Sequence, residues 1–505
     1  MELSSLLHDL HLSSSSSSEK PRPSADLHPI TELLPQLQEK LIGSPFDTCS
    51  LIGRVEQLFQ AADPQWLFSL GSANQEGEGA ELQAAYCSLI SALIGCAALP
   101  LCDDDCSPLS AAAYQSVPIR AAAVSSALTA LIDSWARGGG ARGGLLLAVA
   151  PPLCVFSVTH FQDQLWTSSA SRAAACHLQE ALLRAGQWRD SAHLLIGDQE
   201  NRGILGKVLD VLQPQLSKES LFRCESVKFV FSWTLLQVTR PALSPLLPHL
   251  LPPSLLLSDH HRPENCMMGV HCLHHIVLHT AAADLRQFNR SEVLYHSLFR
   301  LLFTTEAAIV QLVLSCLLDL LLVLEKPPTS LAPSLPRRKS CCHDDVLRLV
   351  LTHMEAEHKV ALRRVYAAAL PPLVDRVGVA ICRHLRRVER VVLGYLEIRD
   401  PPEETSRLKI LEVLQKTIRT TWPRMQSRSD SLLRCLLWLL VDVSSDSELS
   451  DSTRRQLMDQ TSVCLRLLDA CCHGDVQRRL LQVDSSCCSA EVLRCLETVT
   501  TATDQ

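Results

Sequence analysis

The segment PPEETSRLKILEVLQKTIRTTWP, residues 401–423, decides the fold class. Its apolar residues recur every three or four positions, which is the spacing of one face of an α-helix. The residues of this face are Leu408, Leu411, Leu414 and Ile418. The basic residues that we expect largely off it are Arg407, Lys409, Lys416 and Arg419. Because proline disrupts a helix interior, Pro401–Pro402 mark the start of the predicted helix and Pro423 its end.

The same periodicity extends through most of the chain. It begins near Ile30 and is loosely punctuated up to about residue 200. In the second half it predicts helices at Lys207–Leu212, Val227–Val238, Asn265–Thr280, Ser291–Phe303, Glu306–Leu324, Asp344–Met354, Glu357–Leu370, Leu373–Arg386, Arg387–Glu397, Glu403–Thr421, Ser429–Val443 and Ser452–Ala470. Their apolar faces are too broad for one neighbour, and stacked antiparallel helix pairs would bury them.

Composition supports an all-α protein. The 505 residues include 47% hydrophobic, 20% charged and only 5% aromatic residues, with 19 glycines. All-β folds usually draw on aromatic residues and glycine-rich turns, whereas a leucine-rich chain favours packed helices. With helix pairs spaced at roughly 40 residues, the chain predicts an α-solenoid of HEAT- or armadillo-like hairpins.

Breaks in the helical periodicity divide the chain into five segments. We predict a disordered Ser/Pro-rich tail at 1–28, a divergent helical region at 29–200 and helical repeats at 201–325. A flexible loop rich in proline, serine and basic residues is expected at 326–343. Further repeats are expected at 344–505, with an acidic linker at 444–452.

Charge and targeting signals indicate a soluble protein that binds other proteins. The net charge is −7 and the isoelectric point about 6.3, so no basic surface points to nucleic acid. No secretory signal is evident at the N-terminus, and the 21 cysteines are therefore expected to be reduced thiols. We expect no membrane span, because the most apolar stretch, Gln311–Leu324, is too short and Pro151–Pro152 interrupt Leu145–Val158.

No catalytic, cofactor or metal site is predicted. Histidines cluster between His260 and His279, and His271, His275 and His279 share one helical face. Two such imidazoles are able to chelate zinc, but the metalloprotease signature needs a glutamate where Cys272 stands. We favour hydrogen-bonded histidines at a helix–helix contact. The chain also has no nucleophile elbow and no phosphate-binding loop, so an enzyme is not expected.

Basic residues between 363 and 390 form a candidate partner-binding ridge. Its members are Arg383, Arg386, Arg387 and Arg390, with Arg363–Arg364 upstream. The ordinary alternative is a solvated face paired with nearby acids, whereas solenoids often bind partners along such ridges. Ser445, with Glu448 three residues on, fits an acid-directed kinase, as does Ser16 with Glu19. An unmodified polar linker is the alternative there.

Four stretches resemble the Tel-two-interacting protein two family. They are VFSWTLLQVTRP at 230–241, GVHCLHHIVL at 269–278, DVLRLVLTHMEAEH at 345–358 and GYLEIRDPPEETSRLKIL at 394–411. The resemblance covers roughly residues 200–425 and fades toward the N-terminus, so the role of 1–145 is least defined by it.

The resemblance implies a subunit of the Triple T (TTT) complex, with Tel two and Tel-two-interacting protein one as partners. It further implies a non-catalytic co-chaperone scaffold in cytoplasm and nucleus that acts with Hsp90 and R2TP. The clients would be PI3-kinase-related kinases such as mTOR, ATM, ATR and DNA-PK. The alternative is a stand-alone helical-repeat adaptor or transport receptor. A mean hydropathy of +0.12 with few aromatic anchors further predicts poor stability without a partner.

Overall fold

The computed structural model describes residues 29–43, 48–68, 75–102, 109–138, 143–198, 202–325, 341–484 and 488–501. Within these ranges the regular structure is helical, with one isolated bridge between Gly197 and Arg202 and no strand. The expected tail at 1–28, with Ser16, and residues 326–340 of the expected loop lie outside the described residues. The chain forms two compact units, which divide between Leu256 and Leu257.

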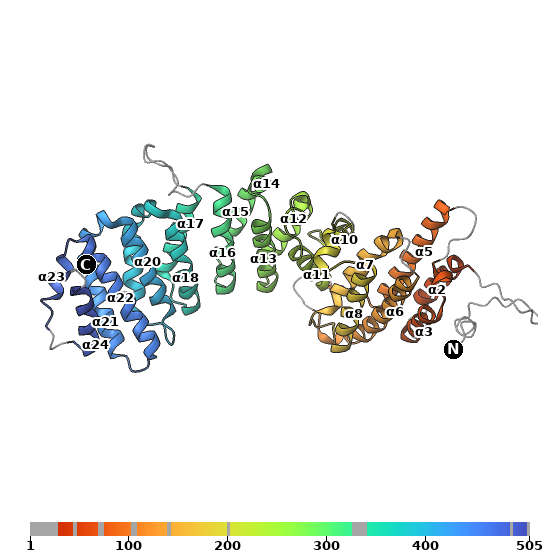
Figure 1. The fold of residues 1–505 in the computed structure, drawn as a ribbon, viewed down its shortest axis with the longest axis horizontal. Helices are drawn as coiled ribbons and strands as arrows, with labels where there is room; N and C mark the ends of the chain where they lie inside the picture. Colours follow the sequence, from red (N-terminus) through yellow and green to blue (C-terminus); the bar gives the residue numbers. More distant parts are fainter. Residues whose placement is uncertain are drawn as a thin grey trace, which may run out of the picture. The chain divides into compact units, whose positions relative to one another are not determined.

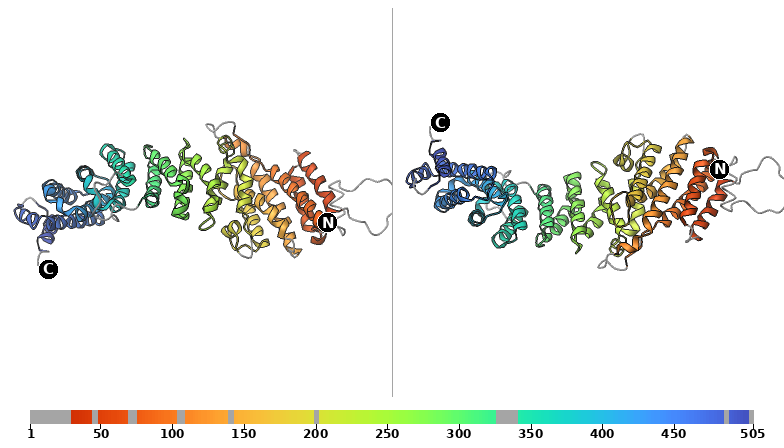
Figure 2. Two further views of the ribbon diagram at one scale, coloured as in Figure 1. Left: turned by 90° about the horizontal axis from the view of Figure 1, so that it is seen from above. Right: turned by 90° about the horizontal axis from the view of Figure 1, so that it is seen from below.

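The first unit is a stack of helical hairpins. Its longer helices are α2 (Ile30–Gly43), α3 (Thr48–Ala61), α5 (Gln75–Cys96), α6 (Val117–Arg137), α7 (Gly143–Phe161), α8 (Ser169–Ala185), α10 (Leu205–Leu212) and α11 (Glu225–Leu236). One layer runs α2, α5, α7 and then α10 and α11, while α3, α6 and α8 form the other. The red to yellow helices stand side by side in both views of Figure 2. Shorter helices are α4 (Pro64–Leu67), η1 (Ala111–Tyr114), α9 (Ser191–Ile196), η2 (Gln213–Gln215) and η3 (Ser244–Leu246).

The second unit repeats the arrangement more regularly. Its longer helices are α13 (Pro263–His279), α15 (Arg290–Leu301), α16 (Ala307–Leu324), α17 (Cys342–Ala356), α18 (Val360–Val377), α19 (Leu385–Glu397), α20 (Thr405–Thr421), α21 (Ser429–Ser445), α22 (Asp451–Cys471) and α24 (Ala490–Thr500). The layer α13, α16, α18, α20, α22 and α24 packs against the layer α17, α19 and α21. Figure 1 shows the helices of this unit in green to blue. The remaining elements are α12 (Leu247–Ser258), which contains the unit boundary, α14 (Ala282–Arg286), η4 (Gln287–Asn289), η6 (Gly378–Arg383), η7 (Trp422–Arg424), η8 (Gln426–Arg428) and α23 (Asp475–Leu480).

This packing confirms the all-α solenoid. In the second unit the pairs α17/α18, α19/α20 and α21/α22 begin at Cys342, Leu385 and Ser429, close to the roughly 40-residue period of such hairpins. Each helix contacts its hairpin partner and the next helix of its own layer. The broad apolar faces are buried in this way, because every pair lies between two others.

Several helices pass through prolines that were expected to end them. Pro151–Pro152 lie inside α7, and Pro371–Pro372 lie inside α18, where two separate helices were predicted. Proline removes a backbone hydrogen bond from a helix interior. Here Leu153, Leu370 and Leu373 next to these pairs are buried between layers, so packing outweighs the local loss.

Four described helices are long and apolar enough to cross a membrane by length and composition. The most apolar is Ala307–Leu324, with mean hydropathy 2.5. This helix begins before the stretch Gln311–Leu324 that was expected to be too short, and the whole helix of 18 residues is long enough. Half of that window is buried inside the unit, against α13, α15 and α18. The described cysteines are all free thiols, and Cys154, Cys316 and Cys464 are buried.

Candidate partner-binding surface

Helix α19 carries most of the predicted arginine ridge. Val388, Val391, Val392 and Tyr395 recur at helical spacing and are buried in the unit. Arg386, Arg387 and Arg390 occupy the opposite side, and Arg383 ends the preceding η6. The local sequence therefore produces an amphipathic helix whose outer face is basic.

Three of the four arginines contact acids of α17. Arg387 Nη2 lies 3.1 Å from Glu355 Oε2 and also donates to Thr352 Oγ1 at 2.8 Å. Arg390 Nη2 lies 3.5 Å from Glu355 Oε1, and Arg383 Nη1 lies 3.6 Å from an oxygen of Asp344. The hydrogen bond from Arg387 lowers the pKa of Glu355. These contacts join α17 to α19 and have the form of the paired, solvated face that was the alternative to a ridge.

Arg386 is the exposed member for which no ion pair is found among the described residues. The upstream pair lies inward: Arg363 is buried with its guanidinium 3.8 Å from the Tyr395 ring centre, and Arg364 donates to Asp400 at 2.7 Å. Of the predicted ridge, Arg386 and the neighbouring Arg390 are therefore the arginines most available to a partner.

Helix α21, which packs beside α19, carries two exposed apolar side chains. Trp438 is 44% exposed and Val441 47% exposed, while Leu436, Leu439 and Leu440 are buried. Sequence analysis missed this feature. The signal was available, because Trp438 and Val441 fall off the helix's main apolar stripe. Tryptophan and arginine are the residues most enriched at the energetic centres of interfaces.

A cluster of charged residues joins α20 and α21. Arg407 Nη1 lies 3.0 Å from Asp442 Oδ2, and Arg399 Nη2 lies 2.5 Å from Asp442 Oδ1. Burial raises the pKa of Asp442, but the hydrogen bonds from the two arginines outweigh it and the pKa falls. Arg407 is 1% exposed, so the expectation that it lies off the buried face was wrong. From the sequence alone, an arginine that is buried in an ion pair cannot be distinguished from one that is exposed to solvent.

Ser445 is the last residue of α21 and is exposed. Its hydroxyl donates to the carbonyl of Asp442 at 3.0 Å. The chain between α21 and α22 comprises residues 446–450, inside the expected linker at 444–452. Ser445 is therefore accessible, and its modification stays a prediction.

The histidine cluster lies on α13 and at its N-terminal approach. His274 Nε2 lies 2.9 Å from Asp319 Oδ2 of α16, while the rings of His275 and His279 are 4.4 Å apart. A contact between α13 and α16 is therefore present at His274. Among the described residues, side chains that could together hold a metal ion meet outside this histidine cluster. They are Glu325, Cys341 and His343.

Comparison with known proteins identifies the family. The chain is 45% identical over 353 residues to human TELO2-interacting protein 2, covering 70% of this chain and 69% of that protein. The chain belongs to the TELO2-interacting protein 2 family. The mouse member is also 45% identical, over 350 residues, covering 69% of this chain and 68% of the mouse protein. No family model matches the chain.

Solved structures of karyopherins are similar only at a low level. Kap121p bound to RanGTP has 13% identity and a TM-score of 0.45, covering 98% of this chain and 48% of that one. Importin beta has 12% identity and a TM-score of 0.41, covering 99% of this chain and 62% of that one. The fold assignment rests on the helix packing described above.

Proposed function

We propose that this chain is a non-catalytic scaffold subunit of the TTT complex, with TELO2 and the Tel-two-interacting protein one subunit as its partners. The observation that carries the proposal is the 45% identity to human TELO2-interacting protein 2 over more than two thirds of both chains. The name of that protein gives TELO2 as its binding partner. A stack of helical hairpins supports this role, because such stacks present extended surfaces to other proteins.

The docking surface of the proposal is the outer face of α19 and α21. We define this α19–α21 face by Arg386, Arg390, Trp438 and Val441, all of which are exposed. It combines aromatic and arginine side chains, the composition of energetic centres in interfaces. The ion pairs of Asp442 with Arg407 and Arg399 join α20 and α21 on one side of this face.

The same proposal places the protein with Hsp90 and R2TP in the maturation of PI3-kinase-related kinases. The protein would be soluble in the cytoplasm and nucleus, and its four apolar helices would bury their faces within the stacks rather than in lipid. It would thereby support DNA-damage and growth signalling by keeping mTOR, ATM, ATR and DNA-PK folded.

Quantitative affinity purification tests the proposal. The chain, tagged at its chromosomal locus, should recover the TELO2 and Tel-two-interacting protein one subunits in equal molar amounts. Acute depletion of the chain should then lower the cellular levels of mTOR and ATM. Recovery of unrelated cargo with neither subunit would overturn the assignment in favour of a stand-alone adaptor.

A further inference from the structure

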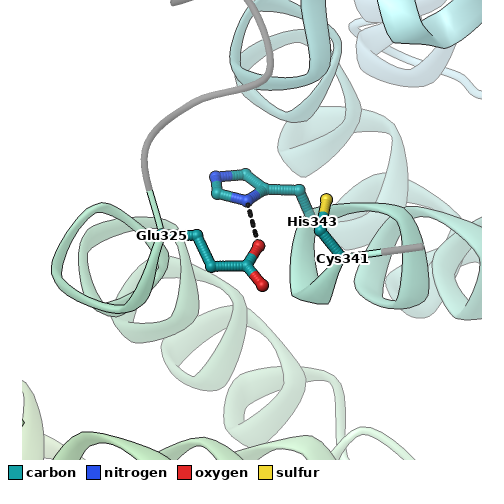
Figure 3. A group of neighbouring side chains, drawn as sticks. All are labelled: Glu325, Cys341 and His343. Atoms are coloured by element: carbon teal, nitrogen blue, oxygen red, sulfur yellow. Dashed lines mark hydrogen bonds and ion pairs between the residues drawn. The ribbon is translucent and has the colours of Figure 1, made fainter. Parts of the chain in front are cut away.

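Three side chains with metal-binding atoms meet where α16 ends and α17 begins. Glu325 follows the last residue of α16, Cys341 is the N-cap of α17, and His343 is the second residue of α17. One ligand atom from each lies within 4.8 Å of the other two. Figure 3 shows the Glu325 carboxylate facing the His343 ring, with the Cys341 thiol beside them. His343 Nδ1 lies 3.4 Å from Glu325 Oε2, and the His343 side chain is fully buried.

The surrounding backbone and side chains hold this group in place. The amide of Cys342 donates to Glu325 Oε2 at 3.1 Å, which holds the carboxylate at the start of α17. In the metal-free chain the thiol of Cys341 donates to Asp344 Oδ2 at 3.4 Å, a hydrogen bond that is given up when the thiol loses its proton to bind a metal. Asp344 itself stays held by His384 Nε2, 3.2 Å away. Metal ligands in proteins are usually oriented by an outer set of such contacts.

Helix capping alone does not account for these residue types. Cys341 occupies an N-cap, where its side chain accepts from the Asp344 amide. Serine, threonine, aspartate and asparagine are the preferred N-caps, because sulfur is a weak acceptor. A thiol at this position therefore calls for a second role, and a buried imidazole and a carboxylate lie next to it.

We propose that Glu325, Cys341 and His343 bind one Zn²⁺, through a carboxylate oxygen, Sγ and Nδ1, with water in the fourth position. Mixed sulfur, nitrogen and oxygen donors are the ligand set of zinc. On binding, the Cys341 thiol releases its proton to solvent and the His343 ring keeps its proton on Nε2. One carboxylate and one thiolate then balance the charge of the ion at a site where His343 is buried and the other two ligands are partly buried.

The ion would link the two helices that flank residues 326–340. Binding displaces the proton of the Cys341 thiol, and affinity is therefore expected to rise with pH. This group was not predicted from the sequence, because residues 326–340 separate Glu325 from Cys341.

Metal analysis of the full chain tests the site. The chain is purified under a non-thiol reductant without chelator, and its zinc content is measured by mass spectrometry. We expect one zinc per chain, and replacement by Co²⁺ should produce a sulfur-to-cobalt charge-transfer band. The variant C341S keeps a good N-cap but removes the sulfur ligand, so its circular dichroism should be unchanged. Its affinity for Co²⁺ should fall at least about tenfold, and the band should disappear.

The matched control is C435S, which removes a half-buried thiol of α21 and should leave zinc content and the cobalt band unchanged. Glu325→Gln is the second variant, and it should weaken Co²⁺ binding while keeping an oxygen acceptor for the Cys342 amide. If the wild-type chain binds Co²⁺ without a charge-transfer band, or binds neither ion in stoichiometric amount, the proposal is wrong. Equal Co²⁺ affinity of a folded C341S and the wild type would also overturn it.

Discussion

Arg407 shows how a charged residue becomes part of the core. Its guanidinium lies 3.0 Å from Asp442, 3.5 Å from Glu404 and 5.9 Å from the Trp438 ring centre. Taking a guanidinium out of water is costly unless its charge is balanced. Glu404 at the N-cap of α20 and Asp442 on α21 balance it. The residue therefore fixes the relative positions of the two helices.

Replacing Arg407 with methionine is expected to lower the free energy of unfolding by about 3 kcal/mol, because Asp442 and the buried Glu404 lose a counter-charge. Urea unfolding followed by circular dichroism measures this change. The matched control, Arg386→Met, removes an exposed arginine and should change the free energy of unfolding by less than about 0.5 kcal/mol. Equal effects of the two variants would contradict the role of Arg407.

His160 introduces a pH dependence in the first unit. Its side chain is 1% exposed, and burial lowers its pKa to about 4. Above the unfolded-state pKa of about 6.5 the ring is neutral in both the folded and the unfolded chain, so its protonation does not change the free energy of unfolding. As pH falls below 6.5 the unfolded chain takes up a proton that the folded chain refuses until about pH 4, so stability is lost across that window.

Between pH 7 and pH 5 the wild type should therefore lose about 2 kcal/mol more stability than a His160→Leu variant. Unfolding of both proteins at the two pH values gives this difference directly. The matched control replaces the exposed His358 with glutamine and should behave like the wild type. If His160→Leu loses as much as the wild type, the buried ring is not the source of the pH dependence.

At the scale of elements, helix α13 approaches its neighbour closely at Gly269. A Cβ at this position would lie 2.1 Å from the backbone nitrogen of Ser258 and 2.5 Å from the carbonyl carbon of Leu257. Backbone atoms cannot rotate away as a flexible side chain does. The glycine therefore sets the distance between α13 and the end of α12.

Gly269→Ala is expected to destabilise the protein by about 2–3 kcal/mol through this clash. Gly394→Ala is its matched control, because a Cβ at Gly394 in α19 would meet no atom within 4 Å. The control should be stabilising by up to about 1 kcal/mol, since alanine favours helices over glycine. Thermal unfolding of both variants checks the signs, and a stable Gly269→Ala protein would refute the close approach.

Helices could be predicted from the sequence where the apolar periodicity and the proline stop signals agreed. Helix α20 was expected at Glu403–Thr421 and begins two residues later, at Thr405. Helix α18 was expected as two helices, because Pro371–Pro372 are a local stop signal that the sandwiched position between α16 and α20 overrides. The contacts of Arg387 with Glu355 could not be predicted either, since they depend on how two helices pack rather than on either sequence.

At the scale of the whole molecule, the α19–α21 face offers a partner both charge and apolar surface. Arg383 and Arg387 are engaged with α17, so reversing their charges would disturb the fold as well as any interface. Arg386 and Trp438 are exposed and provide a cleaner test. Truncating an aromatic residue at the centre of an interface commonly costs 2 kcal/mol or more.

The double variant Arg386→Glu, Trp438→Ala is expected to weaken binding to the proposed partners by more than about tenfold without loss of helical circular dichroism. Pull-down at a series of concentrations measures the affinity. Trp422→Ala, an exposed tryptophan outside the α19–α21 face, should bind as the wild type does. Wild-type affinity in the double variant would exclude this face as the interface.

Exposed apolar residues are spread over both units, including Ile119, Phe288 and Phe303. Apolar residues scattered singly over a surface are ordinary in proteins, whereas a partner covers contiguous patches. The hypothesis that the protein is poorly stable alone therefore stays a prediction from the positive mean hydropathy and the few aromatic residues.

The central claim, a helical scaffold built to bind the two other TTT subunits, is tested most directly by reconstitution. The purified chain is mixed with purified TELO2 and Tel-two-interacting protein one from the same organism, and the mass of the eluting species is measured by light scattering. The account predicts a single species with one copy of each chain and a higher unfolding temperature for this chain. Three separate peaks, with this chain monomeric and unchanged in stability, would contradict it.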